Sequence, residues 1–450
     1  MAGKLSYSIF STFITQILIF FLGILVSVIL ARQLGPEIKG VYSIVTLFPS
    51  LLVYFTSFSL GQAAIYYIGK AKYSRKEIYG STIILGFFIS IICFIGGGLM
   101  LLCHNLFFPG IELKYLIIGI FAAPCQIFFG YLGYTMLAIQ RIWKYNFFSF
   151  LQALLFFIFI VVIYLLNSIK IEYLIVGEIA IYLFILFFMF IALNKEMGAT
   201  RPEFNFDYAK KAFAFGSRVY LGNILSFASC RFNILIINFL TNPFQVGLWS
   251  VAIAISEKLW FFSDAVGTVL FPRTAAENDK ENLKELTPRV FRSVMVINSL
   301  MVVLLFLFGG WIINFLYSYQ YEEAVAPFKI LLAGALSLSG IKIIESDLKG
   351  RGRPGLVAKI SAVALAVNVA LILALIPAHG IKGAAWASTI AYISSFIFAL
   401  TVYLRISGNP LNNMIVIKIS DVIVIWRFFK EICHKISNSL YGFFNRNHYT

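Results

Sequence analysis

The sequence predicts an all-helical integral membrane protein with about twelve transmembrane helices in two bundles of six and with both termini in the cytoplasm. Three observations lead to this prediction: the apolar composition, the alternation of basic connections, and a short motif that occurs twice. Hydrophobic residues make up 60% of the 450 residues and charged residues 12%, and the mean hydropathy is +0.88. Soluble globular chains carry about 25% charged residues, so this composition excludes that class.

Twelve apolar stretches are each near or beyond the roughly 20 residues with which a helix crosses a bilayer. The first six are Ser8–Leu30, Val41–Ile68, Tyr79–Leu102, Tyr115–Ile139, Asn146–Leu166 and Ile171–Leu193. The second six are Gly216–Leu240, Gly247–Phe271, Ser293–Tyr317, Val325–Leu348, Leu356–Ile376 and Gly383–Leu404.

Lys and Arg concentrate in every second connection between these stretches. The basic connections carry Lys70 to Lys76, Arg141 and Lys144, Lys195 to Lys211, Arg273 to Arg292, and Lys349 to Arg353. The intervening connections hold few, such as Arg32 and Lys39 after the first stretch. Because Lys and Arg mark the cytoplasmic side, the alternation predicts that both termini are cytoplasmic. The net charge of +16 then reflects membrane topology, and no nucleic-acid partner is expected.

A corner motif occurs in both halves of the chain. In LARQLGPEIKGVYS (30–43) and FLTNPFQVGLWS (239–250), Pro36 aligns with Pro243 and Gly40 with Gly247, at an offset of 207 residues. A proline and a glycine allow two helices to be joined by a tight turn. A repeated unit of six spans inserts both copies with the same orientation, as parallel repeats do. We therefore expect a first lobe over 1–205, a second lobe over 206–406, and an interfacial amphipathic tail over 407–450.

These residues give the chain its resemblance to a known family. The segment ARQLGPEIKGVYS resembles the N-terminal signature of Wzx-type repeat-unit flippases, the O-antigen and polysaccharide exporters of the MATE-like MOP superfamily. The second half adds VGLWSVAIAISEKLWFF (246–262), LFPRTA (270–275), GRGRP (350–354) and LIPAHGIKGAAWAST (375–389). The likeness extends to about Arg405.

The resemblance implies a multi-pass protein of the bacterial cytoplasmic membrane that moves undecaprenyl-diphosphate-linked oligosaccharide between leaflets for capsule or O-antigen synthesis. The implied partners are this lipid-linked substrate and membrane lipid, with a polysaccharide polymerase and co-polymerase as further candidates. Such transport involves no covalent step, so neither an enzyme nor a cofactor is expected. The sequence contains no pattern of metal ligands and only four histidines.

Charged residues inside the spans are the first candidates for the site, because each costs about 2.5–3.5 kcal/mol or more at mid-membrane unless paired or hydrated. Arg231 lies in the seventh span, and Glu257, Lys258 and Asp264 lie in the eighth. Arg231 and Glu257 are about equally far from the turn near Phe244, so we expect them to pair. Spacing places Glu257 and Asp264 on one helix face. Arg231 is a candidate for the diphosphate. The coupling or ion-pair candidates are Glu257, Asp264 and Lys258.

A second cationic candidate lies nearer the cytoplasm. Lys342 lies in the tenth span, Lys359 begins the eleventh and Arg218 begins the seventh. They could form a mouth that captures a diphosphate, although Glu345 and Asp347 could instead neutralise Lys342.

The first half offers polar and aromatic residues, and Glu178 is the exception to an almost complete lack of charges inside its spans. Sugar-contact candidates are Gln62, Gln126, Tyr54 and Tyr131, because amides and phenols suit hydroxyl groups, although tyrosines near helix ends are commonly interfacial anchors. At the repeat offset Ser50 corresponds to Glu257.

Two alternatives share this architecture. A MATE-like cation-coupled multidrug antiporter would be expected to carry carboxylates in the first two spans, which have none. A lipid II flippase is the other alternative, and it would be expected to carry cations in the first half.

Overall fold

The computed structural model describes residues 2–70, 72–198, 203–276 and 280–418. Within these ranges the chain is helical and contains no strand. The first half has α1 (Ala2–Thr56), α2 (Leu60–Gly69), α3 (Arg75–Leu102), α4 (His104–Phe107), α5 (Leu113–Ile120), α6 (Ala122–Ala138), α7 (Ile142–Leu165) and α8 (Ile171–Met197). The second half has α9 (Phe206–Leu240), α10 (Pro243–Ser256), α11 (Lys258–Ala276), α12 (Lys280–Tyr317), the 3-10 helix η1 (Tyr319–Ala324), α13 (Val325–Gly350), α14 (Pro354–Ser407) and α15 (Leu411–Ile415).

The described residues contain nine helices that are long and apolar enough to cross a membrane, or ten when the bent pair α10 and α11 counts as one span. The two longest, α1 and α14, each contain a glycine with positive φ, Gly35 at 68° and Gly380 at 54°. Glycine adopts this conformation without the steric cost of a Cβ. Each of these helices therefore consists of two arms joined at a glycine.

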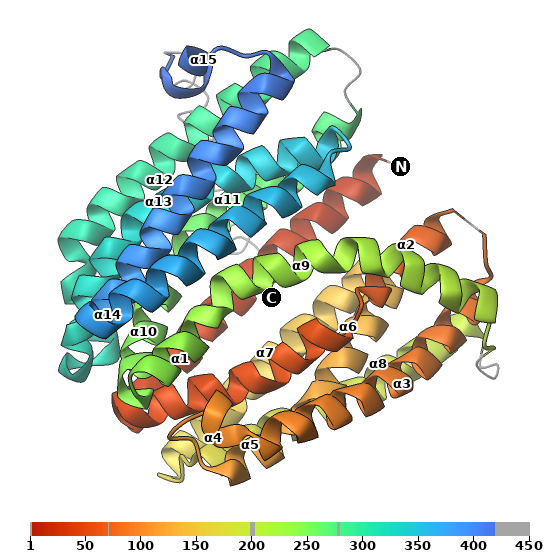
Figure 1. The fold of residues 1–450 in the computed structure, drawn as a ribbon. Coiled ribbons are helices and arrows are strands. Elements are labelled where there is room, and N and C mark those ends of the chain that lie inside the picture. The colour runs from red at the N-terminus through yellow and green to blue at the C-terminus, as the bar shows by residue number, and fades with distance from the viewer. Residues whose placement is uncertain (1, 71, 199–202, 277–279, 419–450) are drawn as a thin grey trace, which may run out of the picture.

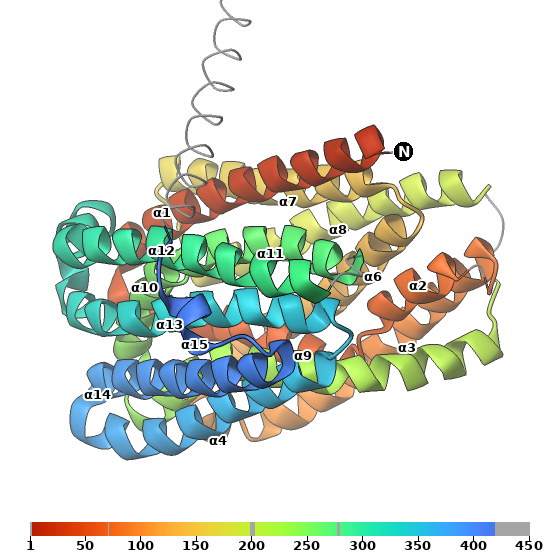
Figure 2. The same cartoon turned by 90° about the horizontal axis from the view of Figure 1, so that it is seen from above.

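The helices form two groups with α1 and α9 between them (Figure 1). Helices α2 to α8 lie in one group and α10 to α14 in the other, where α12, α13 and α14 run side by side (Figure 2). Helix α1 packs against α7 and α10, and α9 packs against α2 and α14, so both bridge the groups. The groups are close at the end that holds the α1 break and α10, and they diverge toward the α2–α3 and α13–α14 connections (Figure 1).

The two copies of the corner motif contact each other at the close end, which we call the corner end. A Cβ built on Gly40 would lie 1.7 Å from the Pro243 carbonyl oxygen, and one on Gly247 would lie 1.8 Å from the Pro36 carbonyl oxygen. Only glycine permits such an approach of two backbones. Because each glycine meets the proline of the other copy, the contact is the same when the copies are exchanged.

The start of α9 is anchored to the first group. Asn205 donates a side-chain hydrogen bond to Glu77 (2.7 Å), the acid of the capping box that begins α3. Asp207 accepts hydrogen bonds from Lys211 (2.5 Å) and Tyr73 (2.6 Å), which lower the pKa of its carboxyl group. The polar joint between the repeats is thus fixed by hydrogen bonds to the first group.

Buried amides connect α9 to both arms of α14. Asn233 donates to the Ser388 hydroxyl at 2.9 Å, and Asn368 donates to the Asn233 side-chain oxygen at 2.6 Å. All three side chains are buried, so their polar groups are satisfied by one another, as buried polar groups require. Most of the expected amphipathic tail, residues 419–450, lies outside the described residues.

Candidate functional site

A cavity of about 730 Å³ lies where the two copies of the repeat meet. Its volume is in the range of small-molecule pockets, about 300–1,000 Å³. Helices α1, α6 and α8 contribute Ser27, Lys39, Tyr42, Ser43, Thr46, Leu47, Ser50, Tyr54, Gln126, Phe129, Gly130, Glu178 and Tyr182. Helices α9, α10 and α11 contribute Phe227, Arg231, Ile234, Ser250, Ile253, Ala254, Glu257 and Lys258.

Equivalent positions of the two copies line this central cavity. Ser43 and Ser250 differ by the offset of 207 residues, as do Thr46 and Ile253, Leu47 and Ala254, Ser50 and Glu257, and Ser27 and Ile234. The cavity is therefore lined by equivalent positions of the two copies of the repeated sequence, and repeat-built carriers place their substrate sites between their repeats.

The expected pair of Arg231 and Glu257 is present in this cavity. Arg231 Nη1 lies 3.5 Å from Glu257 Oε1, and the two side chains are 38% and 22% exposed. Glu257 occupies the break between α10 and α11, where the helix axis bends by 42°. The ion pair is long and open to the cavity, so an anion can reach the guanidinium.

Five ionisable side chains of the cavity leave an excess of one positive charge when all are ionised. Lys39, Arg231 and Lys258 are cationic, and Glu178 and Glu257 are acidic. Lys258 lies over the Phe20 ring, with its Nζ 4.6 Å from the ring centroid. A net positive, partly aromatic cavity favours an anionic ligand.

Two of the sugar-contact candidates line the cavity as well. The Tyr54 ring stacks on Phe227 with centroids 3.9 Å apart, and Gln126 lines the wall contributed by α6. Tyr131 is buried, and its hydroxyl donates to the Ser57 carbonyl oxygen at 2.7 Å. Gln62 lies in α2, outside the cavity lining. The role of all four in binding sugar remains a prediction.

Asp264 belongs to α11, seven residues beyond the bend at Glu257, and it is not part of the Arg231–Glu257 pair. Asp264 Oδ1 lies 3.6 Å from Lys342 Nζ, and Lys342 also lies over the Trp260 ring at 4.6 Å. Neither residue lines the central cavity. Of the two acids expected near Lys342, Glu345 pairs with Lys349 at 3.9 Å and Asp347 with Arg351 at 2.5 Å. Asp264 of α11 is thus the acid in direct contact with Lys342, and Glu345 also interacts electrostatically with Lys342, as expected.

Lys359 and Arg218 are the remaining candidates for the cytoplasmic mouth. Lys359 is exposed on α14. Arg218 belongs to α9, but its side chain lies outside the described part of the structure. Capture of a diphosphate by Lys342, Lys359 and Arg218 remains a prediction.

Sequence reasoning missed three residues of the site. Lys39 was assigned to a connection between spans, whereas it lies on α1 and lines the cavity, 8% exposed. Glu178 and Tyr182 of α8 also line it. Their spacing of four residues on an apolar helix is a signal that could have identified them, because it places both side chains on one face.

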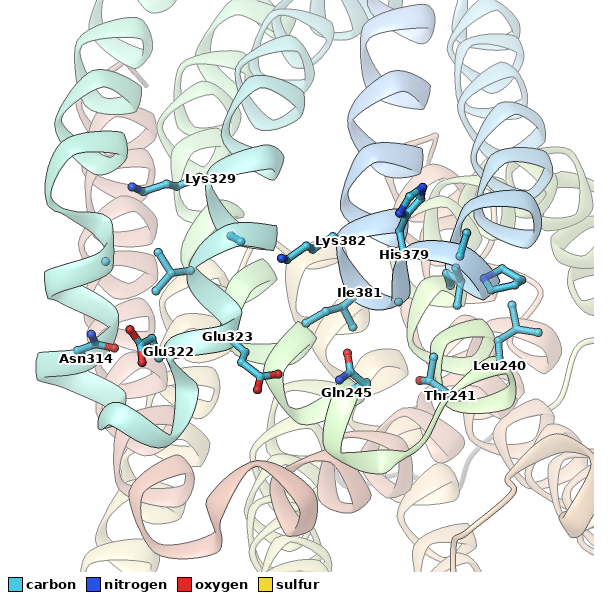
Figure 3. A pocket seen from close by; sticks show the side chains of 17 residues that line it. Leu240, Thr241, Gln245, Asn314, Glu322, Glu323, Lys329, His379, Ile381 and Lys382 are labelled. Carbon is cyan, nitrogen blue, oxygen red and sulfur yellow. The ribbon is translucent and has the colours of Figure 1, made fainter.

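A second, larger cavity of about 1040 Å³ lies at the corner end of the second group. Figure 3 shows Lys329 and Lys382 on one side of it and Glu322 and Glu323 on the other, with Gln245 and Thr241 between the helices. All of its lining residues fall between 240 and 382. Only one copy of the repeat therefore builds it.

A chain of long apolar helices, with a polar cavity lined by both halves of the chain, has the architecture of a membrane carrier. The chain belongs to the polysaccharide biosynthesis protein family, whose model matches residues 29–326, and the family expected from the sequence is thereby confirmed.

Two relatives and one solved structure illustrate the match. An uncharacterised membrane protein of Methanocaldococcus jannaschii is 25% identical over 84% of this chain and 79% of its own length. A probable low-salt glycan biosynthesis flippase of Haloferax volcanii, Agl15, is 23% identical over 47% of this chain and 48% of its own length. The lipid II flippase MurJ in an inward closed conformation shares the fold, with a TM-score of 0.73, 16% identity and coverage of 93% of this chain and 92% of that chain.

Proposed function

We propose that the protein is a flippase that moves undecaprenyl-diphosphate-linked oligosaccharide from the cytoplasmic to the outer leaflet for cell-surface polysaccharide synthesis. The observation that carries this proposal is the net positive central cavity, which contains Arg231 beside aromatic and amide side chains. Family membership and the named glycan flippase among its relatives support it.

The proposed topology has twelve spans. Counting each arm of α1 and α14 separately, and α10 with α11 as one bent span, raises the nine long helices to twelve. The basic connections then fall on the cytoplasmic side with both termini, so the corner end faces outward. On this topology residues 1–205 and 206–406 form the two lobes, in the bacterial cytoplasmic membrane.

The structure corresponds in this proposal to an inward-facing state. The corner contacts hold the lobes together on the outer side, and the lobes diverge toward the cytoplasmic side (Figure 1). A diphosphate would enter from the cytoplasm and meet Arg231, while Tyr54 and Gln126 contact the first sugars. The lipid tail would remain in the bilayer. Rocking of one lobe against the other would then open the corner end, as in other carriers built from repeats.

Glu257 is the proposed switch of the site. It neutralises Arg231 in the empty cavity, and a bound diphosphate would compete for the guanidinium. Release of Glu257 from Arg231 would leave a carboxylate at the helix break that can take up a proton or a cation. The Lys342–Asp264 pair lies outside the cavity and is proposed to hold α11 against α13.

Reconstitution tests the function directly. Proteoliposomes would contain a labelled undecaprenyl-diphosphate oligosaccharide, and a membrane-impermeant reagent would report its exposure. We expect protein-dependent movement that is lost in Arg231→Gln. The control is Lys329→Gln, which removes a cation of the second cavity and should keep the movement.

Two outcomes would contradict the proposal. Export of an organic cation against a proton or sodium gradient, without movement of the oligosaccharide, would identify a multidrug antiporter. Movement of lipid II alone would identify a lipid II flippase. Association with a polysaccharide polymerase or co-polymerase is a further proposal, and co-purification from membranes tests it.

A further inference from the structure

We propose that Lys39 forms a second anion site in the central cavity, nearer the corner end than Arg231, and that it binds the phosphate groups of the substrate on their way outward. This inference rests on the proposed function, because it assigns the residue that receives the anion after Arg231.

Lys39 is a buried cation without a counterion. Only 8% of the residue is exposed, and it lines the central cavity. Its Nζ lies 5.3 Å from the centroid of the Tyr42 ring. In the described chain no carboxylate lies within 4.0 Å of this Nζ, whereas Arg231 in the same cavity has Glu257. A buried charge is normally paired because its desolvation is costly, so the ammonium is suited to an anion that is not part of the chain.

The fold itself does not require a cation at this position. The equivalent residue of the second copy is Val246, which is completely buried against the same kind of corner. Because valine packs well in one copy, the lysine of the other copy is not explained by the geometry of the corner. Its presence in the cavity indicates a role in binding.

The hydroxyls near Lys39 on α1 already donate to other atoms, which leaves the Lys39 ammonium to donate hydrogen bonds to an anion. Ser43, Thr46 and Ser50 each donate to a carbonyl oxygen one turn back on their own helix, at 2.9 to 3.2 Å. Their protons are therefore occupied, whereas the three N–H groups of the Lys39 ammonium have no hydrogen-bond acceptor among the described residues.

Lys39 and the Arg231–Glu257 pair are separated along the cavity. Ser50 is the repeat equivalent of Glu257 and lies eleven residues after Lys39, which is about 16 Å along a helix that rises 1.5 Å per residue. The two cations therefore belong to different depths of the cavity, and an anion moving from the cytoplasmic side toward the corner end would meet Arg231 first and Lys39 second.

Binding of a short diphosphate tests the site without requiring transport. Geranyl diphosphate would be titrated into the full-length protein in detergent, with geraniol as the uncharged control. We expect Lys39→Gln to weaken diphosphate binding about tenfold or more, as the loss of a hydrogen bond to a charged group does, and Lys39→Arg to retain it. Lys114→Gln is the matched control, because Lys114 is exposed and paired with Glu112 at 2.9 Å; it should bind as wild type does.

Melting temperature separates binding from a structural role. Removing an unpaired buried ammonium should leave Lys39→Met at least as stable as wild type, whereas loss of a structural residue would lower its melting temperature. Equal diphosphate affinity of wild type and Lys39→Gln would overturn the inference. If wild type moves the oligosaccharide but Lys39→Gln does so equally well, the inference fails and the proposed function stands. If binding depends on Lys39 but no oligosaccharide moves, the proposed function fails and the anion site stands.

Discussion

Gly40 and Gly247 make the same contact in opposite directions, each against the proline carbonyl of the other copy of the corner. These glycines lie in the second arm of α1 and in α10, and both of these helices line the central cavity. This backbone contact between the copies and the wall of the cavity are thus parts of the same two helices.

Gly40→Ala and Gly247→Ala should each destabilise the closed corner end. The added Cβ would lie 1.7 or 1.8 Å from a backbone oxygen, which cannot rotate away as a side chain can, so a cost of about 1–3 kcal/mol is expected. The measurement uses Ser43→Cys in a background without native cysteines. Its reactivity toward an impermeant thiol reagent added from the outer side should be higher in the two glycine variants. Gly96→Ala is the control, since no atom lies within 4 Å of its Cβ; equal behaviour of the two variants would contradict the role of the corner.

Exchanging the charges of Arg231 and Glu257 separates a structural ion pair from an anion site. The double variant Arg231→Glu with Glu257→Arg retains one charge of each sign at a distance near 3.5 Å. If the pair only supports the fold, the exchange should restore both stability and transport. Because we place the cation at a specific point of the cavity, we expect stability to recover in melting experiments and transport to stay at least tenfold below wild type. Full recovery of transport would show that the diphosphate does not depend on Arg231.

Removing the Asn368 side chain should loosen the packing of α9 against α14. Asn368→Ala leaves the buried oxygen of Asn233 without its donor at 2.6 Å, at a cost of about 1–2 kcal/mol as for hydrogen bonds between membrane helices. Thermal unfolding in detergent measures the loss. The control is Ser337→Ala, which removes an exposed hydroxyl that donates to a carbonyl oxygen of its own helix and should leave the unfolding midpoint unchanged. An equal shift of the midpoint in the two variants would refute the prediction.

Asp347 is expected to be the most sensitive acid of the second group. Its side chain is inaccessible to solvent and accepts hydrogen bonds from Thr287 (2.7 Å) and Arg351 (2.5 Å). Asp347→Ala would leave the Arg351 guanidinium, 16% exposed, without its carboxylate, and breaking a buried pair costs about 3–5 kcal/mol. Glu285→Ala removes an exposed pair at 3.6 Å and should cost about 0–1 kcal/mol. A comparison of yield and unfolding midpoint distinguishes the two variants.

Most of the fold could be predicted from the sequence because membrane spans are local features. Each apolar run is long enough to identify a helix by itself, and the Pro–Gly corner identifies the repeat. The Arg231–Glu257 pair could be predicted for the same reason, since both residues lie at similar distances from the turn near Phe244.

The missed parts of the site depend on breaks and on packing between distant segments. The break at Glu257 follows the run VAIAIS, which contains neither proline nor glycine, so nothing local marks the bend. The contact of Lys342 with Asp264 depends on how α11 crosses α13. Lys39 looked like a residue of a connection between two spans, and only the packing of α1 against α10 shows that it lines the cavity.

The exchange of glycine and proline between the corners is the pattern of a symmetric dimer interface, in which the same surface meets itself. In a true dimer every substitution appears twice, so a cavity on the axis can hold only matched residues. Once both copies belong to one chain, each can change alone. Val246 corresponds to Lys39, and Ser50 corresponds to Glu257. Two unequal copies in one chain therefore allow a directional cavity, with different chemistry at its two ends.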